Sequence, residues 1–275
     1  MATPPFPAPR PLLARLTSPS GPPRAGVHRR EGATVMAVPN RYSVTYLLAG
    51  PQAVTVVDVG SIADVPRVLE ALAWLGRPAS QVDAVVATHL HFDHVMGVDD
   101  LARRLDVPVV MGAVAHRTVA SGRPPRFPDR QRRWHAWAGW PMQGMPLLPG
   151  RDWREGLAFG TPWGRNPFRA RVAPPPNDGD LLPGQPGWRL LETPGHSDDA
   201  ICLFHEASGF LVCGDTIRNF LGGEWNPLWT DADAYAATRA RLLALPVRTV
   251  FPGHGPVLDG PDVLQRVRLL PPYLP

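Results

Sequence analysis

The chain has 275 residues, a formal net charge of +4 and no lysine, so all 28 of its basic residues are arginines. This length supports one large hydrophobic core with one sizeable insertion, and the absence of any run of ~20 apolar residues excludes a helical membrane span. The arginines are scattered apart from a local group between residues 123 and 133, which disfavours nucleic acid as the partner.

The N-terminal residues 1–25 are rich in proline, which predicts an extended arm ahead of a single domain at residues 26–275. The prolines interrupt the apolar stretches of this arm, so we predict no secretory signal peptide. The chain has two cysteines, Cys202 and Cys213, and we expect a cytoplasmic protein with reduced thiols. Two predicted strands form a hairpin that sets the cysteines opposite each other, and buried thiols are favoured over a disulfide.

Short segments rich in β-branched residues predict buried strands in the first half of the chain. Residues 54–57 and 82–88 have this composition, and each fits a strand that is covered on both faces. The first strand ends in a turn, Asp58-Val59-Gly60. From residue 96 to residue 105 the spacing of the apolar side chains predicts a helix.

Four residues that bind divalent cations stand close together between that second strand and that helix. They are His89, His91, Asp93 and His94, and three of the nine histidines of the chain are among them. Crowding unpaired imidazole and carboxylate groups into a folded interior is costly unless a cation binds them. Zinc takes both imidazole nitrogen and carboxylate oxygen. The run therefore predicts a metal site in a strand-to-helix loop.

Between about residues 119 and 180 the alternation of strands and helices stops, and five of the nine tryptophans lie here. Residues 128–139 predict a helix with Trp134 and Trp137 on one face, followed by Trp140. We interpret the segment as an aromatic lid that overhangs the metals and selects an apolar acyl group. A mini-core that buries its own tryptophans and a lipid-docking surface are the alternatives.

Three later segments repeat one pattern, a predicted strand followed at once by a Gly-containing turn with a histidine or an aspartate. The strands are at residues 188–193, 210–213 and 249–251. The turns carry His196, Asp215 and His254. Open α/β sheets bind ligands just beyond the carboxyl ends of their strands, so we expect these three side chains to join the earlier run. Trp225 follows Asp215 by a short loop, and its position makes it a candidate for lining the pocket.

These residues give the pattern HxHxDH, then His, Asp and His, in order and complete. In this the sequence resembles the metallo-β-lactamase superfamily of hydrolases, from about residue 43 to residue 256. The resemblance implies a four-layer αββα sandwich with two metal ions at one end. It assigns one ion to His89, His91 and His196, the other to Asp93, His94 and His254, and a bridging role to Asp215.

The same resemblance implies that Asp58 orients ligands by hydrogen bonds. We also expect Asp93, besides its role as a ligand, to position and polarise a metal-bound water. Two cations about 3.5–4 Å apart lower the pKa of a shared water to near 7 and polarise a carbonyl oxygen. We therefore expect a dinuclear metal-dependent hydrolase that uses a metal-bridging hydroxide on a small carboxyl ester, thioester or lactone. Zinc is the favoured metal, with iron or manganese as alternatives.

Subclasses of the family differ at positions that this sequence shows. Its β-lactamases usually place Cys or Ser where this chain has Asp215, whereas glyoxalase II and acyl-homoserine-lactone lactonases use the ligand set found here. Two alternatives stay open: a phosphodiesterase or nuclease that applies the same chemistry to phosphorus, and a non-catalytic metal-binding scaffold. We expect a small-molecule substrate, and the sequence carries no prediction of the oligomeric state.

Overall fold

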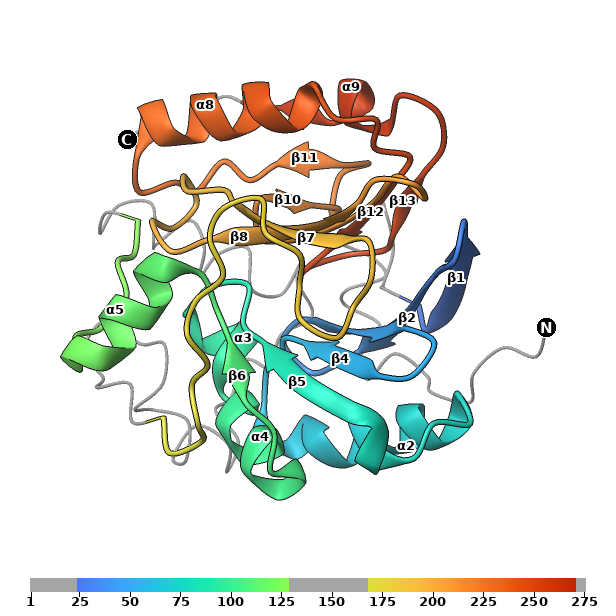
Figure 1. Ribbon diagram of the computed structural model, residues 1–275. Helices are drawn as coiled ribbons and strands as arrows, with labels where there is room; N and C mark the ends of the chain where they lie inside the picture. Colours follow the sequence, from blue (N-terminus) through green and yellow to red (C-terminus); the bar gives the residue numbers. More distant parts are fainter. Residues whose placement is uncertain (1–23, 129–167, 271–275) are drawn as a thin grey trace.

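The computed structural model describes residues 24–128 and 168–270. Two sheets face each other in the middle of the molecule, and helices cover the outer face of each sheet (Figure 1). The expected four-layer αββα sandwich is thus confirmed. All but the last two residues of the predicted N-terminal arm lie outside the described residues. Within the described ranges, no helix is both long enough and apolar enough to cross a membrane.

The first half of the chain forms a six-stranded sheet in the order β1-β2-β3-β4-β5-β6. The strands are β1 (Gly26–Arg30), β2 (Ala33–Pro39), β3 (Val44–Ala49), β4 (Val54–Val57), β5 (Val82–Val86) and β6 (Val109–Val110). The helices are η1 (Ile62–Asp64), α2 (Val65–Trp74), η2 (Ala79–Gln81), α3 (Phe92–Val95), α4 (Val98–Leu105) and α5 (Ala113–Ser121). β1 to β4 pair antiparallel, whereas β4, β5 and β6 pair in parallel.

The second half forms a five-stranded sheet in the order β13-β12-β9-β8-β7 and a small sheet in the order β10-β11-β14. The larger sheet holds β7 (Trp188–Glu192), β8 (Ile201–His205), β9 (Phe210–Gly214), β12 (Thr249–Pro252) and β13 (Leu258–Asp259). The smaller sheet holds β10 (Ile217–Arg218), β11 (Glu224–Trp225) and β14 (Arg268–Leu269). Helices α8 (Ala232–Leu243) and α9 (Val263–Arg266) cover this half (Figure 1).

The core between the two sheets explains why the central strands are apolar on both faces. Tyr46 of β3 and Phe251 of β12 meet there edge to face, with ring centroids 5.5 Å apart. The hydroxyl of Tyr46 also donates to the carbonyl of Pro252, at 2.7 Å, so a buried polar atom links the sheets instead of remaining unpaired. Strands that are covered on both sides have continuous apolar sequences rather than alternating ones.

The strands expected at residues 54–57, 82–88, 188–193, 210–213 and 249–251 are all present, most with ends shifted by one or two residues. β8 and β9 pair antiparallel, and both cysteines are free and buried, as predicted. The helix expected from residue 96 begins instead at Val98, after a separate short helix, α3. The break lies at Gly97, where a Cβ atom would come within 2.5 Å of the Ser61 carbonyl oxygen.

The described residues in the last part of the insertion, from 168 onward, lie along β6 and fix the chain to the first half. Val172 forms a parallel bridge with Val109. Just before it, Oδ1 of Asp99 accepts the backbone N–H groups of Arg169 and Ala170, at 2.6 and 2.7 Å. The helix predicted over residues 128–139 falls almost wholly outside the described residues, so the form of the insertion stays a prediction.

Candidate metal centre

All seven expected ligands come together in two buried groups, and within each group the ligand atoms lie within 4.8 Å of one another. The three-histidine group is formed by His89, His91 and His196. The mixed group is formed by Asp93, His94, Asp215 and His254. The ligands are brought together because the loops after β5, β7, β9 and β12 leave the sheets at the same end of the sandwich.

In the three-histidine group, hydrogen bonds turn one nitrogen of each ring toward the others. Nδ1 of His196 lies 2.7 Å from the Leu228 carbonyl oxygen, and Nε2 of His91 lies 3.1 Å from the Arg126 carbonyl oxygen. A carbonyl only accepts, so these two nitrogens carry the protons. The remaining nitrogens, Nδ1 of His91 and Nε2 of His196, are 3.1 Å apart. Two nitrogens bound to one tetrahedral zinc at about 2.0–2.1 Å are separated by about 3.3 Å.

His89 completes this group through Thr88. The Thr88 hydroxyl donates its proton to Oδ2 of Asp58, at 2.7 Å, and therefore accepts from Nδ1 of His89, at 3.1 Å. This leaves a lone pair on Nε2 of His89, which is buried and has no hydrogen-bond partner among the described residues. An unpaired buried acceptor is costly, and a cation would satisfy it.

The mixed group is centred on Asp215. Its Oδ1 lies 3.1 Å from Nε2 of His94 and 3.3 Å from Nε2 of His254. Its Oδ2 points the other way and lies 3.6 Å from Nε2 of His196. Oδ2 of Asp93 is 3.3 Å from Nε2 of His254. Asp215 is thus the one residue of the two groups that turns a ligand atom to each of them.

Close packing at the mixed group depends on a glycine. A Cβ atom on Gly253 would lie 2.6 Å from Cε1 of His94 and 2.7 Å from Oδ1 of Asp215. Any side chain here would push the ligands apart, because such distances are far below normal contact. The Pro-Gly-His turn after β12 therefore places His254 while it leaves room for the other ligands.

The two groups have opposite electrostatics. Burial lowers the pKa of His89 well below its usual value and that of His196 to about 4. Burial alone would also lower the pKa of His94, but the carboxylates of Asp215 and Asp58 outweigh it and hold this pKa well above its usual value. Burial likewise favours a neutral Asp215, yet His254 and His94 bring its pKa well below the ordinary range. The mixed group is therefore a set of paired charges.

Asp58 holds the ligand loop from the side of β4. Its Oδ1 accepts the backbone N–H of Thr88 at 2.8 Å, and its Oδ2 lies 2.7 Å from Nδ1 of His94. The residue has φ = 57°, a left-handed conformation that Asp and Asn tolerate better than most side chains. This strained turn points one carboxylate at two parts of the ligand run.

Asp199 holds the same loop from the opposite side and was missed by the sequence analysis. Its Oδ2 accepts the backbone N–H of Leu90, the residue between His89 and His91, at 2.9 Å. Oδ1 is buried without a hydrogen-bond partner in the described part of the chain, and burial raises the pKa of this carboxyl. In the sequence, Asp199 could have been noticed as the second of two adjacent acidic residues between the ligand His196 and the strand β8.

The aromatic candidates fall in different places. Trp134, Trp137 and Trp140 lie outside the described residues. Trp225 is 1% exposed and packs in the hydrophobic core beneath α8, and we leave it out of the proposed substrate site. A phenylalanine stacks on one of the ligands: the ring of Phe127 lies on His91 with centroids 4.3 Å apart and an interplanar angle of 18°. The sequence analysis missed it.

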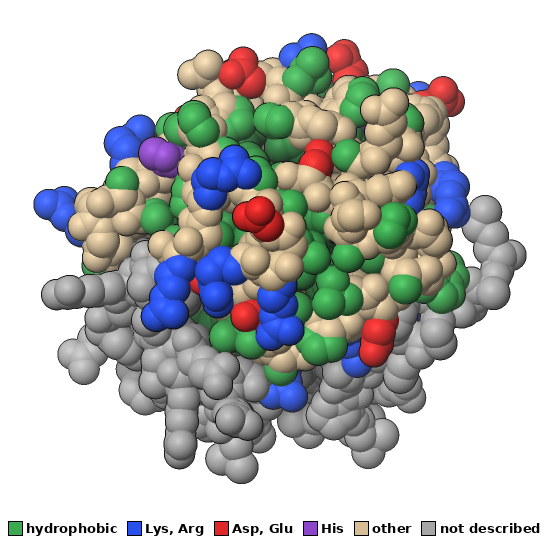
Figure 2. Space-filling view, turned by 60° about the horizontal axis from the view of Figure 1, so that its bottom comes forward, with side chains coloured by type: hydrophobic (Ala, Val, Ile, Leu, Met, Phe, Trp, Pro, Cys, Tyr) green, Lys and Arg blue, Asp and Glu red, His purple; other side chains and the backbone are tan. Residues whose placement is uncertain are grey.

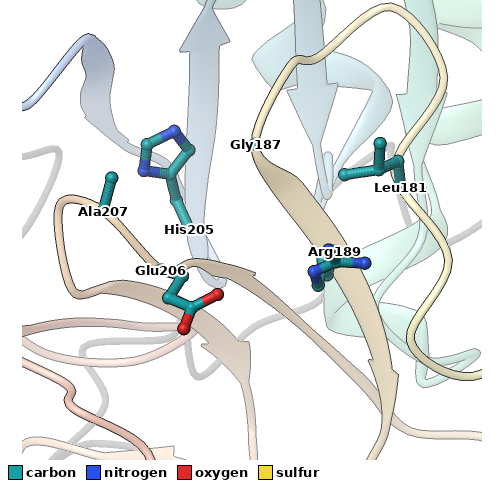
Figure 3. A pocket seen from close by; sticks show the side chains of 6 residues that line it. All are labelled: Leu181, Gly187, Arg189, His205, Glu206 and Ala207. Atoms are coloured by element: carbon teal, nitrogen blue, oxygen red, sulfur yellow. The ribbon is translucent and has the colours of Figure 1, made fainter.

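A separate hollow lies at the other end of the second sheet, between β7 and the turn after β8 (Figure 3). It is lined in part by His205, which pairs across the sheet with Trp188, whereas Ile201 at the other end of β8 pairs with Glu192, near His196. Nδ1 of His205 lies 3.0 Å from the hydroxyl of Ser208. This histidine is the last residue of β8 and lies at the opposite end of that strand from the ligand groups.

The chain belongs to the metallo-beta-lactamase superfamily, whose family model matches residues 38–254. Its relatives include a protein of Bacillus subtilis named "Probable metallo-hydrolase YqjP", 29% identical over 82% of this chain and 72% of that protein. A hydroxyacylglutathione hydrolase of Idiomarina loihiensis is 24% identical over 73% of this chain and 56% of that enzyme. Among solved structures, a metallo-beta-lactamase family protein of Thermus thermophilus has a TM-score of 0.56, with 23% identity over 86% of this chain and 76% of its own.

Family membership confirms the expected metallo-β-lactamase fold. His and Asp side chains are placed for a pair of metal ions. Nε2 of His89, which is buried and makes no hydrogen bond to any described residue, fits a cation in the three-histidine group, and the carboxylates of Asp93 and Asp215 supply the charge that a cation needs in the mixed group. The protein is therefore a metal-dependent hydrolase, as the sequence predicts.

Proposed function

We propose that this protein is a dinuclear hydrolase of a small carboxyl ester, thioester or lactone. The observation that carries the proposal is the sharing of Asp215, whose two oxygens face different ligand groups. Such a carboxylate keeps two cations at the short separation that dinuclear hydrolysis needs. The likeness to a hydroxyacylglutathione hydrolase supports an acyl substrate.

We assign one cation to each ligand group. His89, His91 and His196 would hold one cation, Asp93, His94 and His254 the other, and Asp215 both. Bound zinc ions polarise the substrate carbonyl and lower the pKa of water. Iron or manganese suits the same donor set.

The exposure of the side chains in the mixed group indicates which of them contacts the attacking water. The side chains of Asp93 and Asp215 are 12% and 10% exposed, whereas that of His94 is 0% exposed. Oδ2 of Asp93 is engaged with His254, so its other oxygen is the acceptor for a proton of the water. A carboxylate within hydrogen-bond reach serves as a general base.

The site and the surface favour a small molecule over a polynucleotide. On the face shown in Figure 2, the basic side chains stand in small separate groups with acidic and apolar side chains between them. The described residues of this face offer no continuous basic track for a phosphate backbone. The partner we propose is a small acyl compound, and cytoplasmic location remains our expectation from the buried thiols.

The test is hydrolysis by zinc-loaded protein of p-nitrophenyl acetate, a thioester and a γ-lactone, beside bis-p-nitrophenyl phosphate, with metal content measured on the same sample. We expect turnover of at least one acyl substrate with two ions per chain, and its loss in His196→Ala. His116→Ala is the control, since His116 lies on α5 outside both groups. Hydrolysis of the phosphodiester alone would reject the proposal.

A further inference from the structure

Phe127 lies directly against the three-histidine group. Its ring stacks on His91, with centroids 4.3 Å apart and planes inclined by 18°. The preceding residue, Arg126, gives its carbonyl oxygen to Nε2 of the same histidine, at 3.1 Å. Nδ1 of His91 faces the other ligands, so Phe127 lies beside the position of the first cation.

Phe127 is only half-buried, and this separates it from the aromatic ring on the other side of the centre. Phe220 lies near His254, with ring centroids 6.0 Å apart, but it is 5% exposed. One ring is thus part of the core, and the other keeps free apolar surface next to a ligand. Exposed aromatic surface at the edge of a catalytic centre suits an apolar portion of a ligand.

The charges around Phe127 leave this surface apolar. The guanidinium of Arg126 lies 3.8 Å from the carboxylate of Asp198, and the Arg126 side chain is 65% exposed. The positive charge therefore stays in contact with solvent and is offset by Asp198. Residues 126 and 127 therefore bring two groups to the centre. One is the Arg126 carbonyl, which already accepts from His91, and the other is the aromatic ring of Phe127.

We propose that Phe127 is a specificity-determining residue whose free surface contacts a hydrocarbon group of the substrate next to the scissile carbonyl. This rests on the proposed function, because it places that carbonyl at the cation pair. Either the acyl group or the leaving group carries the hydrocarbon. In either case, a hydrocarbon chain packs against the aromatic ring of Phe127.

The test measures binding, so it does not depend on turnover. Calorimetry on zinc-loaded protein compares acetate, butyrate and hexanoate, which represent the acyl product, and ethanethiol, butanethiol and hexanethiol, which represent a thioester leaving group. We expect affinity in one series to rise two- to fourfold per added methylene, roughly the gain for burying such a group. In Phe127→Ala that dependence on chain length should disappear while acetate or ethanethiol binds as before.

Phe168→Ala is the matched control, because Phe168 is a partly buried phenylalanine that packs on the first hydrophobic core. It should retain the dependence on chain length. The series that shows the gain identifies the side of the scissile bond. The proposal is overturned if neither series gains affinity with length in the wild type, or if Phe127→Ala keeps the gain. It is also overturned if Phe127→Ala weakens all members equally and loses zinc, since the ring would then only hold His91. If the protein hydrolyses no acyl substrate but affinity still rises with chain length and depends on Phe127, the proposed function is rejected and the apolar contact at Phe127 stands.

Discussion

The two ligand groups are similarly buried but are stabilised in different ways. In the three-histidine group, burial holds the pKa values of His89 and His196 low, so these two rings are neutral. The mixed group places two carboxylates against two histidines whose pKa values are raised. Burial of ionisable groups is tolerated either by neutralising them or by pairing them. We therefore expect a cation that binds the mixed group to displace protons from its two histidines.

Removal of Asp215 should have the largest effect, because it is common to both groups. We expect Asp215→Ala to weaken the second metal ion on the order of a thousandfold, the scale of losing one partner from a buried charged pair. It should reduce kcat/KM more than substitution of any single histidine. Elemental analysis and chelator competition measure the first effect. Two retained ions with near-wild-type turnover would contradict the bridging role.

The pH dependence of metal binding should separate the groups next. His94 and His254 have raised pKa values in the metal-free protein, so the proton competes with a cation for them near neutral pH and binding releases protons. As the pH falls, the mixed group should lose its ion first. The three-histidine group should keep its ion until the pH approaches the value of about 4 for His196.

Titration of zinc content between pH 8 and pH 4.5, with proton release followed by calorimetry in two buffers, checks this order. The same shifts affect the metal-free fold with a defined sign. A histidine with a raised pKa stabilises the fold while it is protonated and loses that contribution as the pH rises through the folded pKa. Loss of both ions together in the titration would show that the groups are not distinct.

Substitution of Asp58 or Asp199, the two buried carboxylates that hold the ligand loop, should have a smaller effect on metal affinity. Asp58→Asn removes the charge beside His94, and it should weaken the second ion about 10- to 100-fold. Asp199→Asn keeps an acceptor for the N–H of Leu90 and should change little, whereas Asp199→Ala should weaken the first ion. Chelator competition resolves the two affinities. The assignment fails if Asp199→Asn and Asp199→Ala behave alike while both fold normally.

The sequence predicted the ligands and their strands well because both are marked by residue type. His89 to His94 are recognisable by spacing alone, and three of the five residues of β5 are valines. The structure places all seven expected ligands in the two groups. Their assignment to individual ions stays a prediction.

What the sequence could not give depends on contacts between distant segments. The Arg126 carbonyl that orients His91 is a backbone atom, which no residue type announces. The break before α4 lies at Gly97, which the backbone of Ser61 approaches closely, and strands of two residues such as β10 are too short to show periodicity. Local pattern therefore predicts the ligands, whereas their orientation requires the tertiary fold.

The chain is anchored on either side of residues 129–167, the middle of the insertion, and this anchoring has an evolutionary consequence. Before it, Arg126 is tied to His91; after it, Arg169 and Ala170 are tied to Asp99. With both ends fixed to the scaffold, a change in the length of the intervening segment costs little, about 0.6 kcal/mol for each doubling. Since we predict that this segment selects the substrate, we expect descendants of such a chain to change their substrate by exchanging it while they keep the metal ligands.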